Sequence, residues 1–248
     1  MKVKCLGVSL LTSYILITGC NHITSTVKKE EMTTAAHELN YKNQNNWELE
    51  SGDTQSPINI ETTKTQEMKD SGAIELTYDN AVLVAEDNGH TIQLDVTGTA
   101  KINGRHFDLS QFHIHAPSEH KLDGKHYPIE VHFVNKAQDG RLAVIGVFFK
   151  EGAENQGFKK VIESIKKGAK NTSVGDINIA TMLPANKSYY HYLGSLTTPP
   201  LSENVEWYVM KKPVEVSKAQ IETFQSYYKN NNRDIQPLNK RLILKYEE

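Results

Sequence analysis

The chain has 248 residues, of which 38% are hydrophobic and 23% are charged, and its formal net charge at pH 7 is -2. This length fits one large domain or two small ones and allows a substantial core without disulfides. A near-neutral chain with no clustered basic surface gives no reason to expect a nucleic-acid partner, because binding nucleic acid needs concentrated positive charge.

The N-terminus has the features of an export signal. Two lysines precede an apolar run over residues 5–17, which is shorter than the roughly 20 residues that a transmembrane helix needs. Small residues then stand directly before Cys20, an arrangement that resembles the lipobox of bacterial lipoproteins, in which the cysteine is lipidated. We therefore predict a lipoprotein-type signal peptide over residues 1–19 and a lipid anchor at Cys20 on the outer face of the bacterial cell membrane. The alternative is a plain signal peptide cleaved nearby, which would leave the protein periplasmic or secreted.

Residues 20–40 are polar and rich in Thr, Lys and Glu, which is typical of a flexible tether. Removal of the signal peptide would also remove Cys5, so the mature chain would keep only Cys20 and could form no internal disulfide. We expect the remaining residues, 41–248, to form one folded domain.

This domain consists mostly of short apolar or alternating segments separated by turns. Strands are predicted at residues 73–78, 81–85, 91–96, 101–102, 107–115, 129–135, 142–149, 189–192, 206–210 and 241–246. Asn-Gly and Asp-Gly pairs at positions 88–89, 103–104, 123–124 and 139–140 mark turns. The pattern indicates a mainly β (α+β) fold: a single domain with a large central, mostly antiparallel, twisted β-sheet.

Two short peripheral helices complete the predicted fold. The first has apolar residues at the i, i+3, i+4, i+7 spacing of an amphipathic helix, namely Phe158, Val161, Ile162 and Ile165. Ser217 and Gln220 have the spacing of a capping box, which would open a second helix that buries Ile221 and Phe224.

Three histidines on two predicted strands carry the strongest chemical signal. His113 and His115 project from one face of a strand, and His132 adds a third imidazole on the strand that follows. Three neutral imidazoles with an open fourth position form the catalytic type of zinc site. Gln111 and Glu130 each lie two residues before one of these histidines, where they are well placed to accept its second ring N–H. Ordinary core or surface histidines would explain the first pair alone, and Glu130 could instead be a half-exposed ion-pair residue.

Several longer motifs surround these histidines. They are residues 112–120 (Phe-His-Ile-His-Ala-Pro-Ser-Glu-His), Gly124 with residues 127–132 (Tyr-Pro-Ile-Glu-Val-His), residues 194–200 (Gly-Ser-Leu-Thr-Thr-Pro-Pro) with Ser202, Glu203 and Trp207, residues 55–60 (Gln-Ser-Pro-Ile-Asn-Ile), and residues 236–239 (Gln-Pro-Leu-Asn) with Arg241. Together these motifs resemble the α-class carbonic anhydrases, in a bacterial, lipoprotein-like form. The resemblance spans about residues 41–246.

The resemblance implies that His113, His115 and His132 bind Zn²⁺, with water or hydroxide as the fourth ligand. Zinc lowers the pKa of its bound water to about 7, a value known for carbonic anhydrases themselves. The implied activity is the reversible hydration of CO2 to bicarbonate and a proton by attack of zinc-bound hydroxide. The expected partners are CO2 and bicarbonate, with membrane contact only through the lipid anchor, in a monomer or a homodimer. The alternative is a non-catalytic, carbonic anhydrase-like cell-surface module that binds zinc or another ligand.

Three further residues match catalytic positions of that family. Thr197 matches the threonine that donates its hydroxyl proton to a carboxylate, here Glu119, and so orients the reacting hydroxide. His90 matches the histidine that carries the proton to buffer, since its ordinary pKa lies near neutrality. Without the zinc histidines, Thr197 and His90 would be interpreted as turn residues and Glu119 as a structural ion-pair residue.

The resemblance also assigns the walls of the pocket. An apolar wall for CO2 is implied at Val134, Val144, Leu196, Val205 and Trp207, although each of them would also suit a core. Thr198 and Gln93 match polar residues that line the pocket. His120 matches a buried structural histidine and is not counted as a metal ligand. Many bacterial relatives carry a cysteine of a disulfide just after the Pro-Pro pair, where this chain has Leu201.

Overall fold

The computed structural model describes residues 39–47 and 52–248. The predicted signal peptide, the predicted lipidation site at Cys20 and residues 20–38 of the predicted tether lie outside the described residues. No helix in the described part of the chain is long and apolar enough to cross a membrane.

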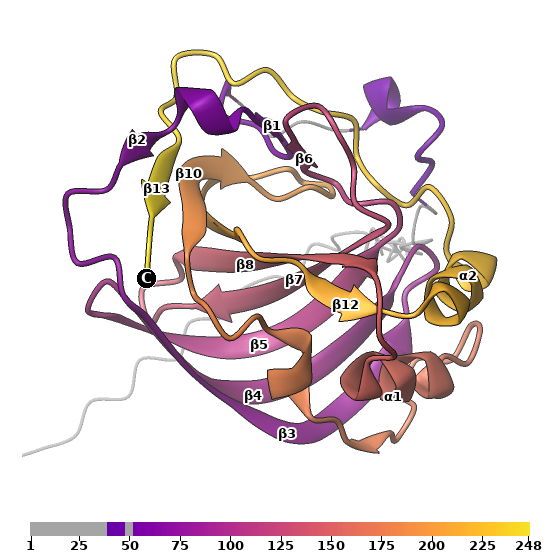
Figure 1. Ribbon diagram of the computed structural model, residues 1–248. Coiled ribbons are helices and arrows are strands. Elements are labelled where there is room, and N and C mark those ends of the chain that lie inside the picture. The colour runs from indigo at the N-terminus through magenta and orange to yellow at the C-terminus, as the bar shows by residue number, and fades with distance from the viewer. Residues whose placement is uncertain (1–38, 48–51) are drawn as a thin grey trace, which may run out of the picture. The chain divides into compact units, whose positions relative to one another are not determined.

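Strands dominate the described residues, with a few short helices beside them (Figure 1). The strands are β1 (Asn59–Ile60), β2 (Gln66–Glu67), β3 (Ile74–Asp87), β4 (Ile92–Ile102), β5 (Arg105–His115), β6 (Lys121–Leu122), β7 (Ile129–Lys136), β8 (Leu142–Glu151), β9 (Gly175–Asp176), β10 (Tyr189–Ser195), β11 (Glu203–Met210), β12 (Val214–Val216) and β13 (Leu244–Tyr246). The helices are the α-helices α1 (Gln156–Ser164) and α2 (Lys218–Tyr227) and the 3-10 helices η1 (Gln44–Asn46), η2 (Thr62–Lys64) and η3 (Ile179–Met182).

One large mixed sheet is the framework of the described domain. It is 11-stranded, in the order β2-β13-β10-β11-β8-β7-β5-β4-β3-β9, with β12 paired to β8. Most neighbours are antiparallel, but β8 runs parallel to β11 and β12, and β13 runs parallel to β2. A separate parallel pair joins β1 and β6. The prediction of a mainly β domain with a large, mostly antiparallel sheet is confirmed.

Two of the predicted strand boundaries are wrong. The segments at 73–78 and 81–85 form one continuous strand, β3, and those at 91–96 and 101–102 form β4. The pairing register of β3 with β4 shifts at residues 78–82 of β3. A β-bulge there accommodates the polar residues, so the strand continues past them. Gly98 pairs with Tyr78 at this point and has a φ of 143°. A Cβ at Gly98 would lie 2.6 Å from the Tyr78 Cα, so only glycine fits.

The two predicted α-helices are present and lie next to each other beyond β12 (Figure 1). Asn155 caps α1, since its side chain accepts a hydrogen bond from the backbone N–H of Phe158 at 2.9 Å. The capping box of Ser217 and Gln220 opens α2, as predicted. The rings of Phe158 and Phe224 lie 5.7 Å apart and join the two helices in the core.

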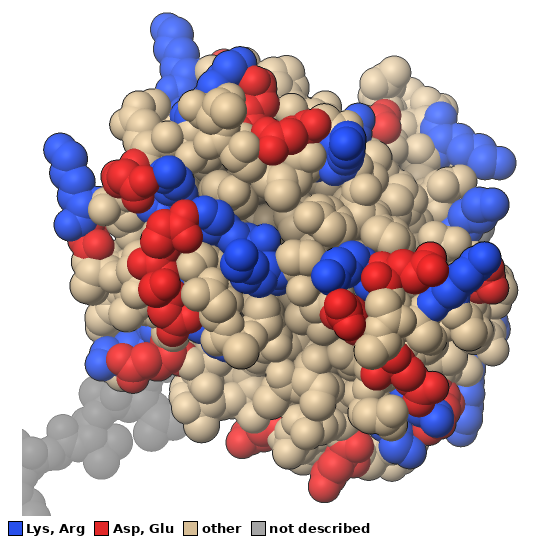
Figure 2. All heavy atoms as spheres, in the orientation of Figure 1, with Lys and Arg blue, Asp and Glu red and all other residues tan. Residues whose placement is uncertain are grey.

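The core has two parts, because alternate residues of each strand face opposite sides of the sheet. Along β7, Val131 and Phe133 belong to the larger cluster, to which α1 and α2 also contribute. Val134, from the other face of β7, belongs to a smaller cluster with Trp207 of β11. Over the surface shown in Figure 2, basic and acidic side chains are interspersed.

Candidate metal centre

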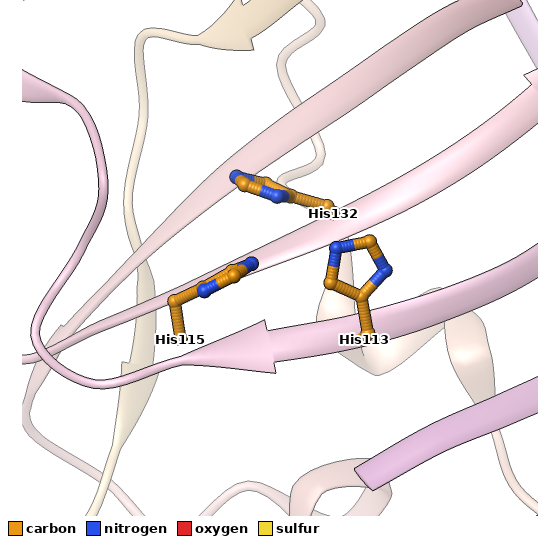
Figure 3. A group of neighbouring side chains, drawn as sticks. All are labelled: His113, His115 and His132. Carbon is orange, nitrogen blue, oxygen red and sulfur yellow. The ribbon is translucent and has the colours of Figure 1, made fainter. Parts of the chain in front are cut away.

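Three histidines from neighbouring strands turn their rings toward one another (Figure 3). His113 and His115 lie two residues apart on β5, and the antiparallel register places His132 of β7 directly opposite His113. The ring centroids are 5.1 Å apart for His113 and His115, 5.3 Å for His113 and His132, and 4.7 Å for His115 and His132. The pairing of two strands thus assembles the triad that the sequence predicts.

Hydrogen bonds fix the orientation of the two β5 histidines. The Nδ1–H of His113 donates to Gln111 Oε1 at 2.9 Å, and the Nδ1–H of His115 donates to the backbone carbonyl of Asn231 at 2.7 Å. These contacts assign the proton to Nδ1 and leave Nε2 of each ring as a lone-pair donor. Burial, followed by the neighbouring histidines for His113, lowers the pKa of both rings, although the Glu119 carboxylate opposes this at His115. Both imidazoles are therefore neutral, the form that binds metal.

Glu130 fixes the third ring. Its Oε1 accepts hydrogen bonds from His132 Nε2 at 2.9 Å and from His120 Nδ1 at 2.7 Å, and its Oε2 accepts from the His120 backbone N–H at 2.8 Å. Burial alone would raise the pKa of Glu130, but the adjacent His120 and His132 hold it well below its usual range. The other ring nitrogen of His120 bonds to the Tyr192 hydroxyl at 2.6 Å. Both ring nitrogens of His120 are engaged, so it acts as a hydrogen-bond partner of Glu130, although His120, Glu130 and His132 lie close enough to hold a metal.

A glycine on the adjacent strand makes room for this arrangement. Gly146 of β8 pairs with His132 across the β7–β8 ladder. A Cβ at Gly146 would lie 3.0 Å from Glu130 Oε1 and 3.9 Å from His132 Cδ2. The missing side chain therefore lets Glu130 approach the His132 ring.

The triad meets the requirements of a metal site. One ring nitrogen from each of His113, His115 and His132 lies within 4.8 Å of the others. The His115 Nε2 atom is buried and has no hydrogen-bond partner among the described residues. A buried polar atom without a partner is costly, and a bound metal ion would satisfy it. These residues could hold a metal ion.

Glu119 and Thr197 are both buried, with exposed fractions of 0% and 5%, and Glu119 lies beside the triad. Glu119 Oε1 accepts a hydrogen bond from the Arg233 backbone N–H at 2.7 Å. Its Oε2 lies 3.6 Å from His115 Nε2 and 3.9 Å from His132 Nδ1 and has no hydrogen-bond partner in the described part of the chain. The hydrogen bond from Thr197 to Glu119 that the family resemblance implies is thus not formed in this structure, and Oε2 is free to accept one.

His90 lies in the turn between β3 and β4 and is half-buried. It lines a cavity of about 590 Å³ together with Tyr41, Tyr228 and Asn231, and its ring centroid lies 6.3 Å from that of Tyr41. Burial, followed by the nearby His115, lowers the pKa of His90 to about 4. The ring is therefore neutral near pH 7, and its unprotonated nitrogen can accept a proton, although burial disfavours the protonated form.

The predicted apolar wall gathers on one face of the sheet. Four of the five predicted wall residues are buried in the smaller core cluster, namely Val134, Val144, Val205 and Trp207. The fifth, Leu196, is half-buried and packs against this cluster. The Trp207 ring lies 4.8 Å from that of His132, so the wall adjoins the triad. Gln93 pairs with His113 across β4 and β5 and donates from Nε2 to Asp95 Oδ1 at 2.9 Å. Thr198 is half-buried on the loop after β10.

Comparison with known proteins identifies the family of this chain. The profile of the eukaryotic-type carbonic anhydrase family matches residues 42–247. The chain belongs to this family. A carbonic anhydrase of Pectobacterium carotovorum is 41% identical over 202 residues, which cover 79% of this chain and 81% of that protein.

Solved structures agree with this assignment. An α-carbonic anhydrase from Thermovibrio ammonificans, in complex with the inhibitor sulfanilamide, matches with 42% identity and a TM-score of 0.74 over 78% of this chain and 87% of that one. The α-carbonic anhydrase of Photobacterium profundum matches with 42% identity and a TM-score of 0.73 over 79% and 90% of the two chains. The chain is therefore a carbonic anhydrase, a lyase, and CO2 hydration is its expected activity.

Sequence reasoning missed several residues that bond to the side chains of this candidate site or leave space for them. Asn231 binds His115, Tyr192 binds His120, Arg233 binds Glu119, and Gly146 leaves space for Glu130. The backbone N–H of Arg233 and the backbone carbonyl of Asn231 make these contacts, so no side-chain pattern could reveal them. For Gly146, a glycine inside a strongly apolar strand was the available signal.

Proposed function

We propose that this carbonic anhydrase hydrates CO2 reversibly to bicarbonate and a proton, with Zn²⁺ held by His113 Nε2, His115 Nε2 and His132 Nδ1. The observation that carries the proposal is the assignment of ring protons: the opposite nitrogen of each ring already bonds to Gln111, Asn231 or Glu130. A site whose second nitrogens are all engaged is preorganised for metal. Zinc held by three neutral imidazoles supplies a Lewis acid that lowers the pKa of a coordinated water to about 7, as known for carbonic anhydrases.

We propose that Glu119 and Thr197 orient the reacting oxygen. The free Oε2 of Glu119 can act only as an acceptor once the carboxyl is ionised, so a Thr197 hydroxyl that reaches it must donate its proton there. The Thr197 oxygen is then left to accept a hydrogen bond, which restricts how the attacking oxygen can point.

The remaining pocket residues have separate tasks in this proposal. The apolar wall around Trp207 offers CO2 a dry surface beside the triad, while Gln93 and Thr198 line its polar side. His90 accepts the proton that the reaction releases and passes it to solvent through the adjoining cavity. The low pKa of His90 favours rapid release of that proton over its uptake.

The test is stopped-flow CO2 hydration with zinc analysis on the same sample of the full-length protein. The wild type should contain about one zinc per chain and be inhibited by sulfanilamide, in line with the binding of this inhibitor by the T. ammonificans relative. The His115→Ala variant should lose both zinc and activity, because it removes a ligand. His106→Ala is the matched control: His106 lies on the same strand, β5, but is exposed, so both properties should be unchanged. Zinc bound at the triad without CO2 hydration would contradict the catalytic proposal and favour a binding module.

We further propose that the protein is exported and lipid-anchored through Cys20. The support is the charged, apolar and small-residue order before Cys20 in the sequence. In a bacterial host, the wild type should fractionate with membranes and carry a lipid on its N-terminal peptide by mass spectrometry. The Cys20→Ser variant should lose the lipid. An unmodified N-terminal peptide that begins at another residue would instead indicate an ordinary signal peptide.

A further inference from the structure

Asn231 lies at a junction between the metal site and the turn that carries His90. It is 4% exposed and follows α2. Its side-chain Oδ1 accepts a hydrogen bond from the Ala116 backbone N–H at 2.7 Å. Its Nδ2 donates to two backbone carbonyls, those of Ile114 and His90, each at 2.9 Å. The amide group thus uses both of its N–H bonds, and the end of β5 and the His90 turn are joined through one side chain.

The backbone of the same residue contacts a metal ligand. The Asn231 carbonyl accepts the hydrogen bond from His115 Nδ1 at 2.7 Å. The backbone of Asn231 therefore binds the His115 ring while its side chain binds the His90 carbonyl. One residue thus links the positions of these two groups.

The His90 turn has one other connection to β5, through the residue that follows His90: the Thr91 hydroxyl donates to the Ile114 carbonyl at 2.6 Å and accepts from the Ile114 backbone N–H at 3.3 Å. Gly89 has a φ of 94°, and no atom lies within 4 Å of the place where its Cβ would be. Within the turn, Asn88 Oδ1 accepts from the backbone N–H groups of His90 and Thr91 at 3.2 Å and 2.9 Å, which shapes the turn locally. Local bonds fix the shape of a turn but not its distance from another element. Thr91 supplies one such connection at the base of the turn, and the bond from Asn231 supplies the one at His90 itself.

We propose that the Asn231 side chain is a positioning residue for proton transfer, which holds His90 at a set distance from the ligand His115. The inference rests on the proposed function, because it assigns His90 the role of proton acceptor. Proton transfer between fixed groups depends steeply on their separation, and a misplacement of about 1 Å can cost about 100-fold in rate. Asn231 therefore acts on proton transfer through His90, and not on the conversion of CO2.

This role predicts a separation of two kinetic parameters. At saturating CO2 and low buffer concentration, kcat includes the return of the proton to solvent, whereas kcat/KM reports only the steps up to CO2 conversion. The Asn231→Ala variant keeps the backbone carbonyl that binds His115. It should lower kcat about tenfold, leave kcat/KM within about twofold of the wild type, and regain kcat when imidazole is added as a mobile proton acceptor.

Two further variants make the test specific. The Asn231→Asp variant keeps the acceptor toward Ala116 but replaces the donor toward His90, so it should show the same separation even if the alanine variant is unstable. Asn232→Ala is the matched control, because the neighbouring Asn232 makes its described hydrogen bond through its backbone carbonyl, and neither parameter should change.

A double-variant comparison and a measurement without metal complete the experiment. If Asn231 acts through His90, Asn231→Ala should cause no further loss of kcat in a His90→Ala background. In chelator-treated protein, the Thr91 amide should exchange its hydrogen at least about tenfold faster in the Asn231→Ala variant than in the wild type. Unchanged exchange at Thr91, equal losses in kcat and kcat/KM, or additive losses with His90→Ala would each overturn the proposal. A zinc-loaded wild type without CO2 hydration would refute the proposed function itself, whereas those outcomes in an active enzyme refute only the role of Asn231.

Discussion

Gly146→Ala is the substitution that tests most directly whether packing sets the metal site. The new Cβ would lie 3.0 Å from Glu130 Oε1, closer than carbon and oxygen normally approach, and 3.6 Å from Val209 Cγ2, which is an ordinary contact. Glu130 cannot easily move away, because three hydrogen bonds of 2.7 to 2.9 Å hold its two oxygens. Overpacking of this kind costs about 1–3 kcal/mol, while replacing glycine within a strand recovers about 0.5–1 kcal/mol. We expect a net loss of about 1–2 kcal/mol in the free energy of unfolding.

The same displacement should weaken metal binding. Glu130 orients His132, and disturbing such a partner of a metal ligand typically lowers metal affinity about 10–100-fold. Urea unfolding of the metal-free protein and zinc competition against a chelator measure the two effects separately. Gly152→Ala is the control, because the three atoms nearest to its Cβ would all belong to the Glu215 side chain, whose 49% exposure lets it move away. Unchanged stability and zinc affinity in Gly146→Ala would refute the argument that this glycine determines where Glu130 lies.

Three more predictions concern pH, a buried hydroxyl and metal removal. Burial and the nearby His115 lower the pKa of His90 to about 4, while an unfolded histidine titrates near about 6.5. The unfolded chain therefore binds the extra proton between these values, and metal-free protein should lose at most about 3 kcal/mol of stability from His90 as the pH falls through this window. Urea unfolding at about pH 7 and about pH 4.5 should show a smaller loss in His90→Ala, and equal losses in both proteins would contradict the assignment. Tyr192→Phe removes a hydroxyl that bonds to His120 and Ser56, so thermal unfolding should show a loss of about 1–3 kcal/mol with zinc retained. Zinc at a thousandfold excess over its Kd should raise the free energy of unfolding by about 4 kcal/mol over chelated protein, and the same gain in His115→Ala would place the metal elsewhere.

Local sequence patterns were sufficient to predict those features of this protein that depend only on residues close together in the chain. The alternation of a strand puts His113 and His115 on one face, and the capping box of Ser217 and Gln220 opens a helix because its hydrogen bonds close within one turn. The prediction of two strands in place of β3 was wrong because the residues that looked like a turn are accommodated by a bulge against β4, a non-local contact.

The sequence by itself determined a mainly β domain and the identity of the three histidines, since residue type and short-range spacing are sufficient for both. Only the tertiary structure decided which nitrogen of His115 is free. At His115 that choice depends on the backbone carbonyl of Asn231, which lies 116 residues away along the chain, whereas the partners of His113 and His132 are Gln111 and Glu130, two residues away on the same strands. Hydrogen bonds between distant segments form only when the folded sheet brings those segments together, so no short-range sequence pattern predicts them.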